Sequence, residues 1–592
     1  MLLALPKALR GISAIAAVLA ATANAVVCFS LFSKKLYATY AQFGLGIELT
    51  FRLYHFSAFI LAAAAGFGLL IALYCAASLR DKPYASKFFA YALISLAFVN
   101  GAVLADNFLV MLFFWEGLLL TVFTMIALTN TAAFQTAIKA LIILGIADLC
   151  MMVGIALTAN LAGTLTISKI HLPLHGLGIV AFILLMIGAI SKAGSMPFHS
   201  WIPDAALAGP LPFMALLPAA LEKLLGIYFL TRISFDLFAL KPESWVSPML
   251  MIIGVVTILL AVMMALVQKD YKRLLSYHAI SQVGYMILGI GTCVPAGMVG
   301  GVFHMINHAM YKSCLFLTGG SVEKQAGTTD LNALGGLAKK MPLTFACFLV
   351  AAASISGVPP FNGFFSKELV YDGALERGWI FYALALLGSF FTAASFLKLG
   401  HAVYLGKPDK HREVKEAPLA MLAPMITIAL LCVGFGLFNA LPIRALIEPV
   451  FGHALEGRHF SGIPANAYLI IATVIVLCAA LINHIMGAKR FGGGLHAVDH
   501  IHHAPVLSAL YEKAEKKWFD PYDIGLKCVG VFSRVGFFFD RAIDWFYEGF
   551  IAGGAKLCAR ALNVLHSGNY ALYVVWSLVG CFVVLAMLFR SI

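Results

Sequence analysis

The feature that most constrains the fold of this chain is a series of apolar runs, each about twenty residues long, the length an α-helix needs to cross a bilayer. Hydrophobic residues make up 61% of the 592 residues. Charged residues make up only 12%, against roughly 25% in soluble domains, which excludes an ordinary soluble enzyme. The sequence predicts an all-α polytopic membrane protein with about fifteen spans, at 10–33, 53–79, 86–105, 106–128, 133–157, 177–200, 210–231, 246–267, 274–292, 296–319, 341–366, 376–399, 418–440, 466–486 and 570–590.

The chain itself is expected to hold no metal and no redox cofactor. Its 11 cysteines are scattered, and no two have the CxxC spacing of a usual iron–sulfur site. A Walker loop is absent, as is a GxGxxG motif after a strand, so no nucleotide site is expected. The net charge of the chain is +13. In membrane proteins such an excess of Lys and Arg usually lies in the short cytoplasmic loops, so nucleic acid is not an expected partner.

Lysine and arginine are divided unevenly between alternate loops, fifteen against ten. Cytoplasmic loops carry the excess in most membrane proteins, so the sequence predicts a cytoplasmic N-terminus and an external C-terminus. No cleavable signal peptide is expected, because the first run has no small-residue cleavage site followed by a polar domain.

The polar stretch 487–569 differs from the rest of the chain and is predicted to be cytoplasmic. It begins with the glycines 492–494 and a histidine cluster, His496–His503. This cluster could bind a metal, but a solvated linker at the membrane interface is the simpler interpretation. Apolar and charged residues interleave at helical spacing over about 522–565, which indicates an amphipathic helix lying along the membrane. The pair Gly553–Gly554 is a candidate for an earlier end of that helix.

Charged residues inside the predicted spans are the main indication of function, because a charge at bilayer depth costs about 2.5–3.5 kcal/mol. Glu116 lies in LFFWEGLLL, and Lys192 lies in GAISKAGSMPFHSW just before Gly194 and Pro197. Glycine and proline there predict a broken helix, which is tolerated where the backbone lines a polar cavity. The alternatives are a carboxylate that only stabilises packing and a lysine that snorkels from a helix end. Asp148 in GIADLCMM is a further buried acid, with a purely local hydrogen bond as its alternative role.

A second group of ionisable residues follows in two later spans. Glu222 and Lys223 lie in LPAALEKLLGIYFL, and as neighbours they point in different directions. His304, His308 and Lys312 are spaced four residues apart, so they drift by only about 80° and share one helix face. Three such groups on one buried face are typical of a proton relay. The alternatives are structural polar contacts and a metal site at the two histidines, for which no carboxylate or thiol partner is evident.

The segment SISGVPPFNGFFSKELV has the same plan as the earlier broken helix. Pro359, Pro360 and Gly363 are predicted to break a helix, and Lys367 and Glu368 follow directly. In the earlier segment the lysine precedes the break, whereas here it follows. Paired broken helices in the two halves of a membrane protein indicate an inverted-repeat transporter.

Four motifs resemble the antiporter-like subunit family of respiratory complex I, Mrp-type cation/proton antiporters and Ech-type membrane-bound hydrogenases. They are KAGSMPFHSWIPDA (192–205), ALVQKDYKRLLSYHAISQVGYMILGIG (265–291), FHMINHAMYKSCLFLTGGSV (303–322) and SGVPPFNGFFSKELV (356–370). The resemblance implies two inverted five-helix repeats, each with a broken helix, and a C-terminal amphipathic lateral helix with an anchor span. The implied organisation is 1–85 for N-terminal spans, 86–231 and 246–399 for the repeats, 418–486 for two further spans, 487–569 for the linker and lateral helix, and 570–592 for the anchor.

By position, the resemblance also implies a row of proton-carrying residues through both repeats. Glu116 and Lys192 match the paired acid and base of the first repeat, and Lys367 matches the lysine of the second broken helix. The remaining members are Lys223, His304, His308 and Lys312, with Asp148, Glu222 and Glu368 in supporting positions.

Two positions depart from the family pattern. Many relatives have a histidine where Pro218 stands, and Lys223 is expected to take its role here. Asp148 is present, but Gly145 stands where relatives often have a basic residue. An identical first half-channel is therefore not expected.

The leading hypothesis is a proton- or sodium-translocating subunit, not itself a redox catalyst, of a membrane-bound energy-converting oxidoreductase in a bacterial or archaeal plasma membrane. Its expected partners are the lipid bilayer, other membrane subunits and peripheral redox subunits. Iron–sulfur clusters, with nickel–iron, flavin or quinone as further candidates, are expected in those partners and not in this chain. The alternatives are a stand-alone or Mrp-type cation/proton antiporter subunit without redox partners, and a membrane scaffold whose charges are vestigial.

Overall fold

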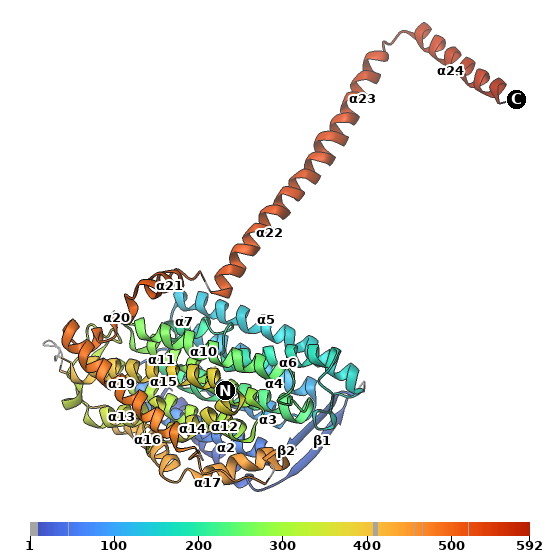
Figure 1. Ribbon diagram of the computed structural model, residues 1–592. Coiled ribbons are helices and arrows are strands. Elements are labelled where there is room, and N and C mark those ends of the chain that lie inside the picture. Colours follow the sequence, from blue (N-terminus) through green and yellow to red (C-terminus); the bar gives the residue numbers. More distant parts are fainter. Residues whose placement is uncertain are drawn as a thin grey trace. The chain divides into compact units, whose positions relative to one another are not determined.

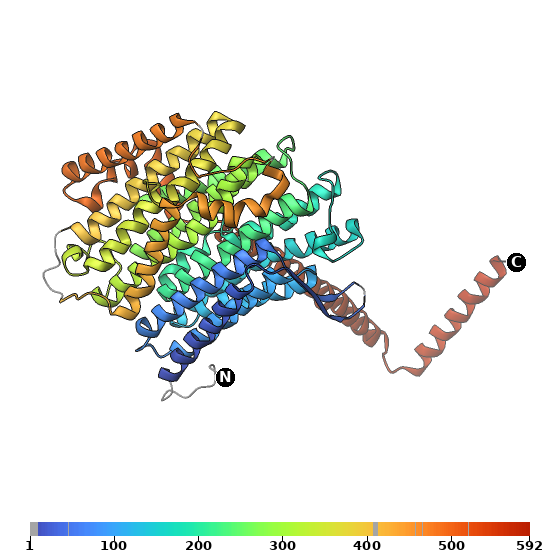
Figure 2. The ribbon, with the colours of Figure 1, turned by 90° about the horizontal axis from the view of Figure 1, so that it is seen from below.

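The computed structural model describes residues 10–44, 46–406, 413–455, 457–464, 466–518 and 520–591. Most of these residues lie in helices (Figure 1), so the predicted helical membrane fold is confirmed. The chain forms two compact units, Met1–Asp520 and Pro521–Ile592. The first unit contains the helices of both predicted repeats. The helices of this unit pack side by side, as Figure 2 shows from a second direction.

Every predicted span contains a helix. Among the described residues, eleven helices are long and apolar enough to cross a membrane, and α6 (Leu177–Ala193) and α13 (Pro342–Ser356) are apolar but shorter. Two long helices, α11 (Tyr271–Thr292) and α12 (Pro295–Ala326), carry many polar residues. Both are almost wholly buried among other helices, so their surfaces need not match lipid. The exact number of crossings stays a prediction.

The first predicted repeat follows two N-terminal helices, α1 (Arg10–Ser30) and α2 (His55–Ser78). Asparagine side chains fix the starts of two of its helices, since Asn107 accepts a hydrogen bond from the Leu109 amide and Asn130 from the Ala133 amide. Its elements are α3 (Ala85–Leu104), α4 (Phe108–Ile126), α5 (Thr131–Ala162), the broken helix α6–α7 (α7, Trp201–Ala208), and a last helix made of α8 (Leu211–Leu216), η4 (Leu217–Leu221), α9 (Glu222–Thr231) and η5 (Arg232–Leu237).

The second predicted repeat has the same succession of elements as the first. The helix before the break, α5 or α12, has 32 residues in both halves, and both final helices end in a π-helical turn. This recurrence supports two repeats, and their inverted relation stays a prediction. The second half consists of α10 (Val246–Val267), α11, α12, the broken helix α13–α14 (α14, Asn362–Arg377), α15 (Trp379–Gly400) and η7 (His401–Leu405).

A β-hairpin that was not predicted from the sequence joins α1 to α2. Its antiparallel strands are β1 (Leu36–Gln42) and β2 (Glu48–Leu53). Thr39 and Thr50 pair across the strands with their hydroxyl oxygens 3.0 Å apart. Threonine and aromatic residues on both sides of a glycine-containing turn were the available signal, but the apolar runs on either side obscured it.

The first unit ends with the helices that follow the second predicted repeat. Residues 494–515, predicted as a cytoplasmic linker, pack on the unit: Val498 clusters with Leu266 and Ala394, and the Tyr511 hydroxyl donates to the Met263 carbonyl (3.1 Å). The elements are α16 (Leu419–Leu437), α17 (Ala440–Pro442), η8 (Ile443–Ile447), α18 (Glu448–Phe451), η9 (Gly452–Leu455), α19 (Ala467–Phe491), η10 (Gly494–His496), α20 (Asp499–His502) and α21 (Pro505–Glu515).

The second unit contains the amphipathic segment and the last apolar helix. The helix α22 (Pro521–Asp544) continues through the π-helical turn η11 (Trp545–Ile551) into α23 (Ala552–Leu565). At 1.5 Å per residue this helix is about 68 Å long. The pair Gly553–Gly554 lies inside α23 and does not end it. The apolar helix α24 (Tyr570–Arg590) follows.

Candidate functional site

The two broken helices end in the same way. Gly194 closes α6 with a φ of 75°, and Gly357 closes α13 with a φ of 79°, a left-handed conformation that favours glycine. Each glycine is followed three residues later by a proline with a cis peptide bond, Pro197 or Pro360. Gly363, predicted as part of the second break, instead lies in the first turn of α14, where a Cβ would clash with the Ser354 carbonyl oxygen.

Lys192 is completely buried at the end of α6 and forms an ion pair with Asp148 of α5, Nζ to Oδ2, at 3.6 Å. The indole Nε1 of Trp115 on α4 donates to the other oxygen of Asp148 at 2.8 Å. The Lys192 Nζ also lies 5.0 Å from the centre of the Trp115 ring. Three helices therefore hold one buried acid–base pair.

Glu116 was predicted as the acid of this pair. Its carboxylate interacts electrostatically with Lys192 but forms no direct ion pair with it, so its role in the pair stays a prediction. Its carboxylate forms no ion pair within the described chain, its Oε1 has no hydrogen-bond partner there, and the residue is only half-buried. The reason is helix geometry: Trp115 faces Asp148, and the next residue on α4 points about 100° away. Asp148, expected only in a supporting position, is the partner of Lys192.

Lys223 and Glu222 are fully buried at the start of α9. Pro218, which lacks an N–H, lies in the π-helical turn η4 just before them, in agreement with the usual effect of proline on a helix. A Cβ at Gly194 would lie only 2.8 Å from the Lys223 Nζ, so Lys223 lies against the first break. Glu222 interacts electrostatically with Lys192, Lys223 and Asp148. Among the described residues, neither the Lys223 Nζ nor the Glu222 carboxylate has a hydrogen-bond partner.

His304, His308 and Lys312 lie on one buried face of α12, as predicted. The Lys312 Nζ donates to the Leu275 carbonyl at 2.8 Å. Neither ring nitrogen of His308 has a hydrogen-bond partner in the described residues. His308 and Lys312 both interact electrostatically with Lys223, which links this face to the first half.

His304 is held by side chains from three directions. Its Nδ1 lies 2.9 Å from the Ser366 Oγ, and its Nε2 lies 3.2 Å from the Gln282 Oε1 and 3.1 Å from the Tyr311 hydroxyl. The Ser366 contact connects α12 to α14, the helix that carries Lys367, and His304 interacts electrostatically with that lysine.

Lys367 lies beside the second break. Its Nζ donates to the Ile355 carbonyl (2.8 Å) and to the Ser389 Oγ (2.9 Å), and it lies 4.8 Å from the centre of the Tyr285 ring. A Cβ at Gly357 would lie 3.3 Å from the Lys367 Cδ. In both halves, therefore, a buried lysine occupies the space beside the glycine that ends the broken helix.

Glu368 points away from this lysine. It accepts a hydrogen bond from the Thr473 hydroxyl of α19 at 2.5 Å. As predicted for neighbouring residues on a helix, the two charged side chains of the pair face different partners.

Electrostatic interactions link the ionisable groups of both halves into one series, here called the buried row. It begins at Asp148 and Lys192, passes Glu222 and Lys223, and reaches α12 and then α14. All its members are at most 2% exposed. The buried row comprises Asp148, Lys192, Glu222, Lys223, His308, Lys312, His304 and Lys367.

Two further buried basic residues were missed as site candidates. His278 of α11 has its Nε2 2.8 Å from the Ser395 Oγ and interacts electrostatically with Lys312, Lys367 and Lys398. Lys398 is buried near the end of α15 and donates to the Leu266 and Gln268 carbonyls at 2.5 and 2.8 Å. The available signal was a histidine and a lysine inside predicted spans.

The histidine cluster His496–His503 is not gathered round one point. His496 bonds to Asp499 (2.7 Å) and His500 to Asn483 (2.9 Å). In the described parts of the chain, no group of three or more His, Cys, Asp or Glu residues is placed to hold a metal ion.

Comparison with known proteins identifies the family. Residues 105–392 match the family model described as NADH:quinone oxidoreductase/Mrp antiporter, TM. The chain is 31% identical to Na(+)/H(+) antiporter subunit A1 of Staphylococcus haemolyticus (strain JCSC1435) over 71% of this chain and 56% of that protein. It is 32% identical to NADH-quinone oxidoreductase subunit L of Escherichia coli (strain K12) over 70% of this chain and 69% of that protein.

Solved structures confirm the fold over almost the whole chain. A chain from the structure of the membrane-bound sulfane sulfur reductase, an archaeal respiratory membrane complex, aligns with a TM-score of 0.67 and 24% identity, covering 98% of this chain and 99% of that chain. The antiporter subunits are longer, and the chain spans about half the length of those relatives. The resemblance found in the sequence motifs is therefore confirmed, and the chain belongs to the NADH:quinone oxidoreductase/Mrp antiporter family of multi-pass membrane subunits.

Proposed function

We propose that this chain moves protons across the membrane along the buried row, as a subunit of a redox-driven membrane complex. The observation that carries the proposal is the continuity of ionisable groups from Lys192 to Lys367 inside an apolar helical body. Buried charges are costly in a membrane and are retained mainly where they serve transport. Groups such as Lys223 and His308, which lack protein hydrogen-bond partners in the described residues, need hydration to be stable, and a hydrated row conducts protons.

The chemistry of the buried row favours protons over sodium ions. Its members are mainly lysines and histidines, whose nitrogen atoms exchange protons. Alkali cations are bound by oxygen atoms instead, and positive lysines repel them. Lysine suits this role because its proton affinity responds to burial and to neighbouring charge, whereas arginine stays charged.

The ion pair of Asp148 and Lys192 couples the charge at Asp148 to proton release from Lys192. Two unit charges 4 Å apart interact by about 4 kcal/mol at an effective dielectric constant of 20. A change of charge or distance at Asp148 therefore alters proton binding at Lys192 by up to about a thousandfold. The released proton would pass Lys223 and α12 towards Lys367. Charge displacement in a neighbouring redox subunit would supply the energy.

The C-terminal unit supports the proposal that the chain has redox partner subunits. The amphipathic helix of residues 521–565 is almost entirely exposed, which suits contact with neighbouring subunits and the membrane interface. The full-length alignment with a chain of a respiratory complex supports the same reading. The expected cofactors lie in those partners, and the N-terminus is expected on the cytoplasmic side of the plasma membrane. The second candidate, an Mrp-type antiporter subunit without redox partners, is favoured by the identity to antiporter subunit A1.

The subunit composition of the native complex, purified in mild detergent, distinguishes between these two proposed functions. We expect mass spectrometry to find iron–sulfur subunits in stoichiometric amounts, with iron confirmed by elemental analysis, because a redox-driven subunit requires them. Nickel would identify a hydrogenase. Only small membrane subunits and no iron would contradict redox coupling and favour the antiporter.

A further inference from the structure

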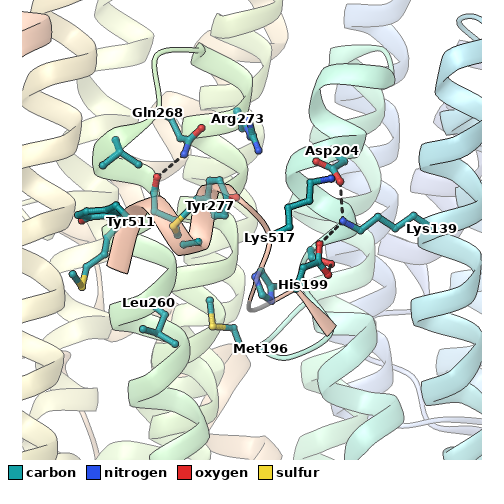
Figure 3. Close-up of a pocket in the computed structure, with 16 residues that line it drawn as sticks. Lys139, Met196, His199, Asp204, Leu260, Gln268, Arg273, Tyr277, Tyr511 and Lys517 are labelled. Carbon is teal, nitrogen blue, oxygen red and sulfur yellow. Dashed lines mark hydrogen bonds and ion pairs between the residues drawn. The ribbon is translucent and has the colours of Figure 1, made fainter. Parts of the chain in front are cut away.

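The first unit contains a cavity of about 600 Å³ that is not lined by any member of the buried row (Figure 3). It lies where α5 begins, α10 ends and α11 begins. Residues that follow the first break, and the end of α21, complete its wall. Its lining residues are Lys139, Met196, His199, Ser200, Asp204, Leu260, Met263, Met264, Val267, Gln268, Arg273, Tyr277, Tyr511, Ala514, Lys517 and Asp520.

The cavity is amphiphilic along its length. Figure 3 shows Arg273, Lys517 and Asp204 towards one end and Leu260 and Met196 at the other. The apolar end lies deeper in the span, since Leu260 is seven residues before the end of α10, about 10 Å at 1.5 Å per residue. An occupant that matches this lining has one polar end and one apolar chain.

The charged residues that line the cavity sum to +1, with His199 counted as neutral, because three cations stand against the two carboxylates of Asp204 and Asp520. Both carboxylates are engaged by Lys139, whose Nζ binds Asp204 at 2.9 Å and Asp520 at 2.6 Å. Arg273 and Lys517 have no ion-pair partner within the part of the chain that the structure describes. The Arg273 Nε is buried there without a hydrogen-bond partner. A headgroup with a negative charge is therefore favoured, and an arginine with a nearby lysine suits a phosphate.

An apolar track continues from the cavity along α10. Leu260 is 44% exposed, Val256 41% and Ile252 53%. The four-residue spacing places these side chains on one helix face. From Leu260 to Ile252 the track covers about 12 Å, close to the roughly 15 Å thickness of one hydrocarbon leaflet. The track suits an acyl chain lying against the helix.

We propose that this cavity binds an anionic glycerophospholipid from the bilayer. The phosphate lies at Arg273 and Lys517, and one acyl chain follows Met263, Met264 and Leu260 onto the exposed face of α10. A free fatty acid also has an anionic headgroup and an acyl chain. It lacks the glycerol body and the second acyl chain that hold a phospholipid in the membrane. The proposal is independent of ion translocation.

The test uses the full-length protein purified in mild detergent and exposed separately to phosphatidylglycerol, phosphatidylcholine and oleate, with bound molecules counted by native mass spectrometry. We expect wild-type protein to retain phosphatidylglycerol in preference to phosphatidylcholine. The double variant Arg273→Gln/Lys517→Gln should lose this preference by roughly fivefold for each charge removed. The matched control Arg80→Gln/Lys82→Gln removes two exposed charges from the loop after α2 and should keep the preference.

A second variant tests the apolar end without changing charge. Met264→Trp fills the cavity and should reduce phosphatidylglycerol retention while thermal stability is unchanged. Equal retention of phosphatidylglycerol and phosphatidylcholine by wild-type protein would overturn the proposal, as would an equal loss in the control variant. Retention of oleate without phosphatidylglycerol would replace the phospholipid with a fatty acid.

Discussion

Replacement of Lys312 by methionine should reduce proton translocation by roughly a hundredfold, the usual effect of removing a group that transfers protons. Lys312 lies on α12 one turn from His308, and both residues interact electrostatically with Lys223. The change therefore removes a proton-carrying group from the place where the two halves of the buried row meet. The measurement is acidification inside vesicles that contain the reconstituted native complex.

The same variant should remain folded. Methionine has a similar length, and replacing a buried charge with an apolar group is often neutral or stabilising. The Leu275 carbonyl loses only the Lys312 Nζ as a donor. The matched control is Lys324→Met, an exposed lysine near the end of the same helix, which should pump normally. Normal pumping by Lys312→Met would remove this residue from the proposed path.

Replacement of Asp148 by asparagine should destabilise the protein by about 3–5 kcal/mol, the cost of leaving one partner of a buried ion pair alone. Asparagine keeps an oxygen that can accept from Trp115, so the change isolates the lost charge. Lys192 would remain buried without its ion-pair partner. The measurement is the thermal midpoint of unfolding in detergent, where we expect a clear decrease.

A double variant distinguishes the ion pair from a general packing effect. Asp148→Asn combined with Lys192→Met removes both charges and should recover most of the lost stability. Asp81→Asn, at an exposed position, is the matched control and should have no effect. If Asp148→Asn alone is as stable as wild-type protein, the ion pair does not have the energetic role assigned to it.

The spans and breaks could be predicted from the sequence because they depend on local patterns. Apolar length fixes a membrane helix, and glycine and proline fix where α6 and α13 end. The face shared by His304, His308 and Lys312 follows from helical spacing alone. These features need no knowledge of how one helix is rotated against another.

The partner of Lys192 could not be predicted in this way. Glu116 and Asp148 both lie inside spans, and only the rotation of α4 and α5 determines which acid faces the lysine. In the structure Trp115 bonds to Asp148, which forms the ion pair with Lys192, and Glu116 at the next position of α4 interacts with the lysine without direct contact. Lys398 was missed for a related reason, because a lysine in the last turn of a span resembles a snorkelling residue until its buried carbonyl partners are known.

The most direct test of proton transfer along the buried row is acidification by vesicles containing the native complex in sodium-free medium, compared between wild-type protein and Lys192→Ala. We predict that wild-type vesicles acidify during electron transfer without sodium. The variant should assemble with the same subunit stoichiometry and fail to acidify. Undiminished acidification by Lys192→Ala, or a strict requirement for sodium in wild-type vesicles, would contradict the account.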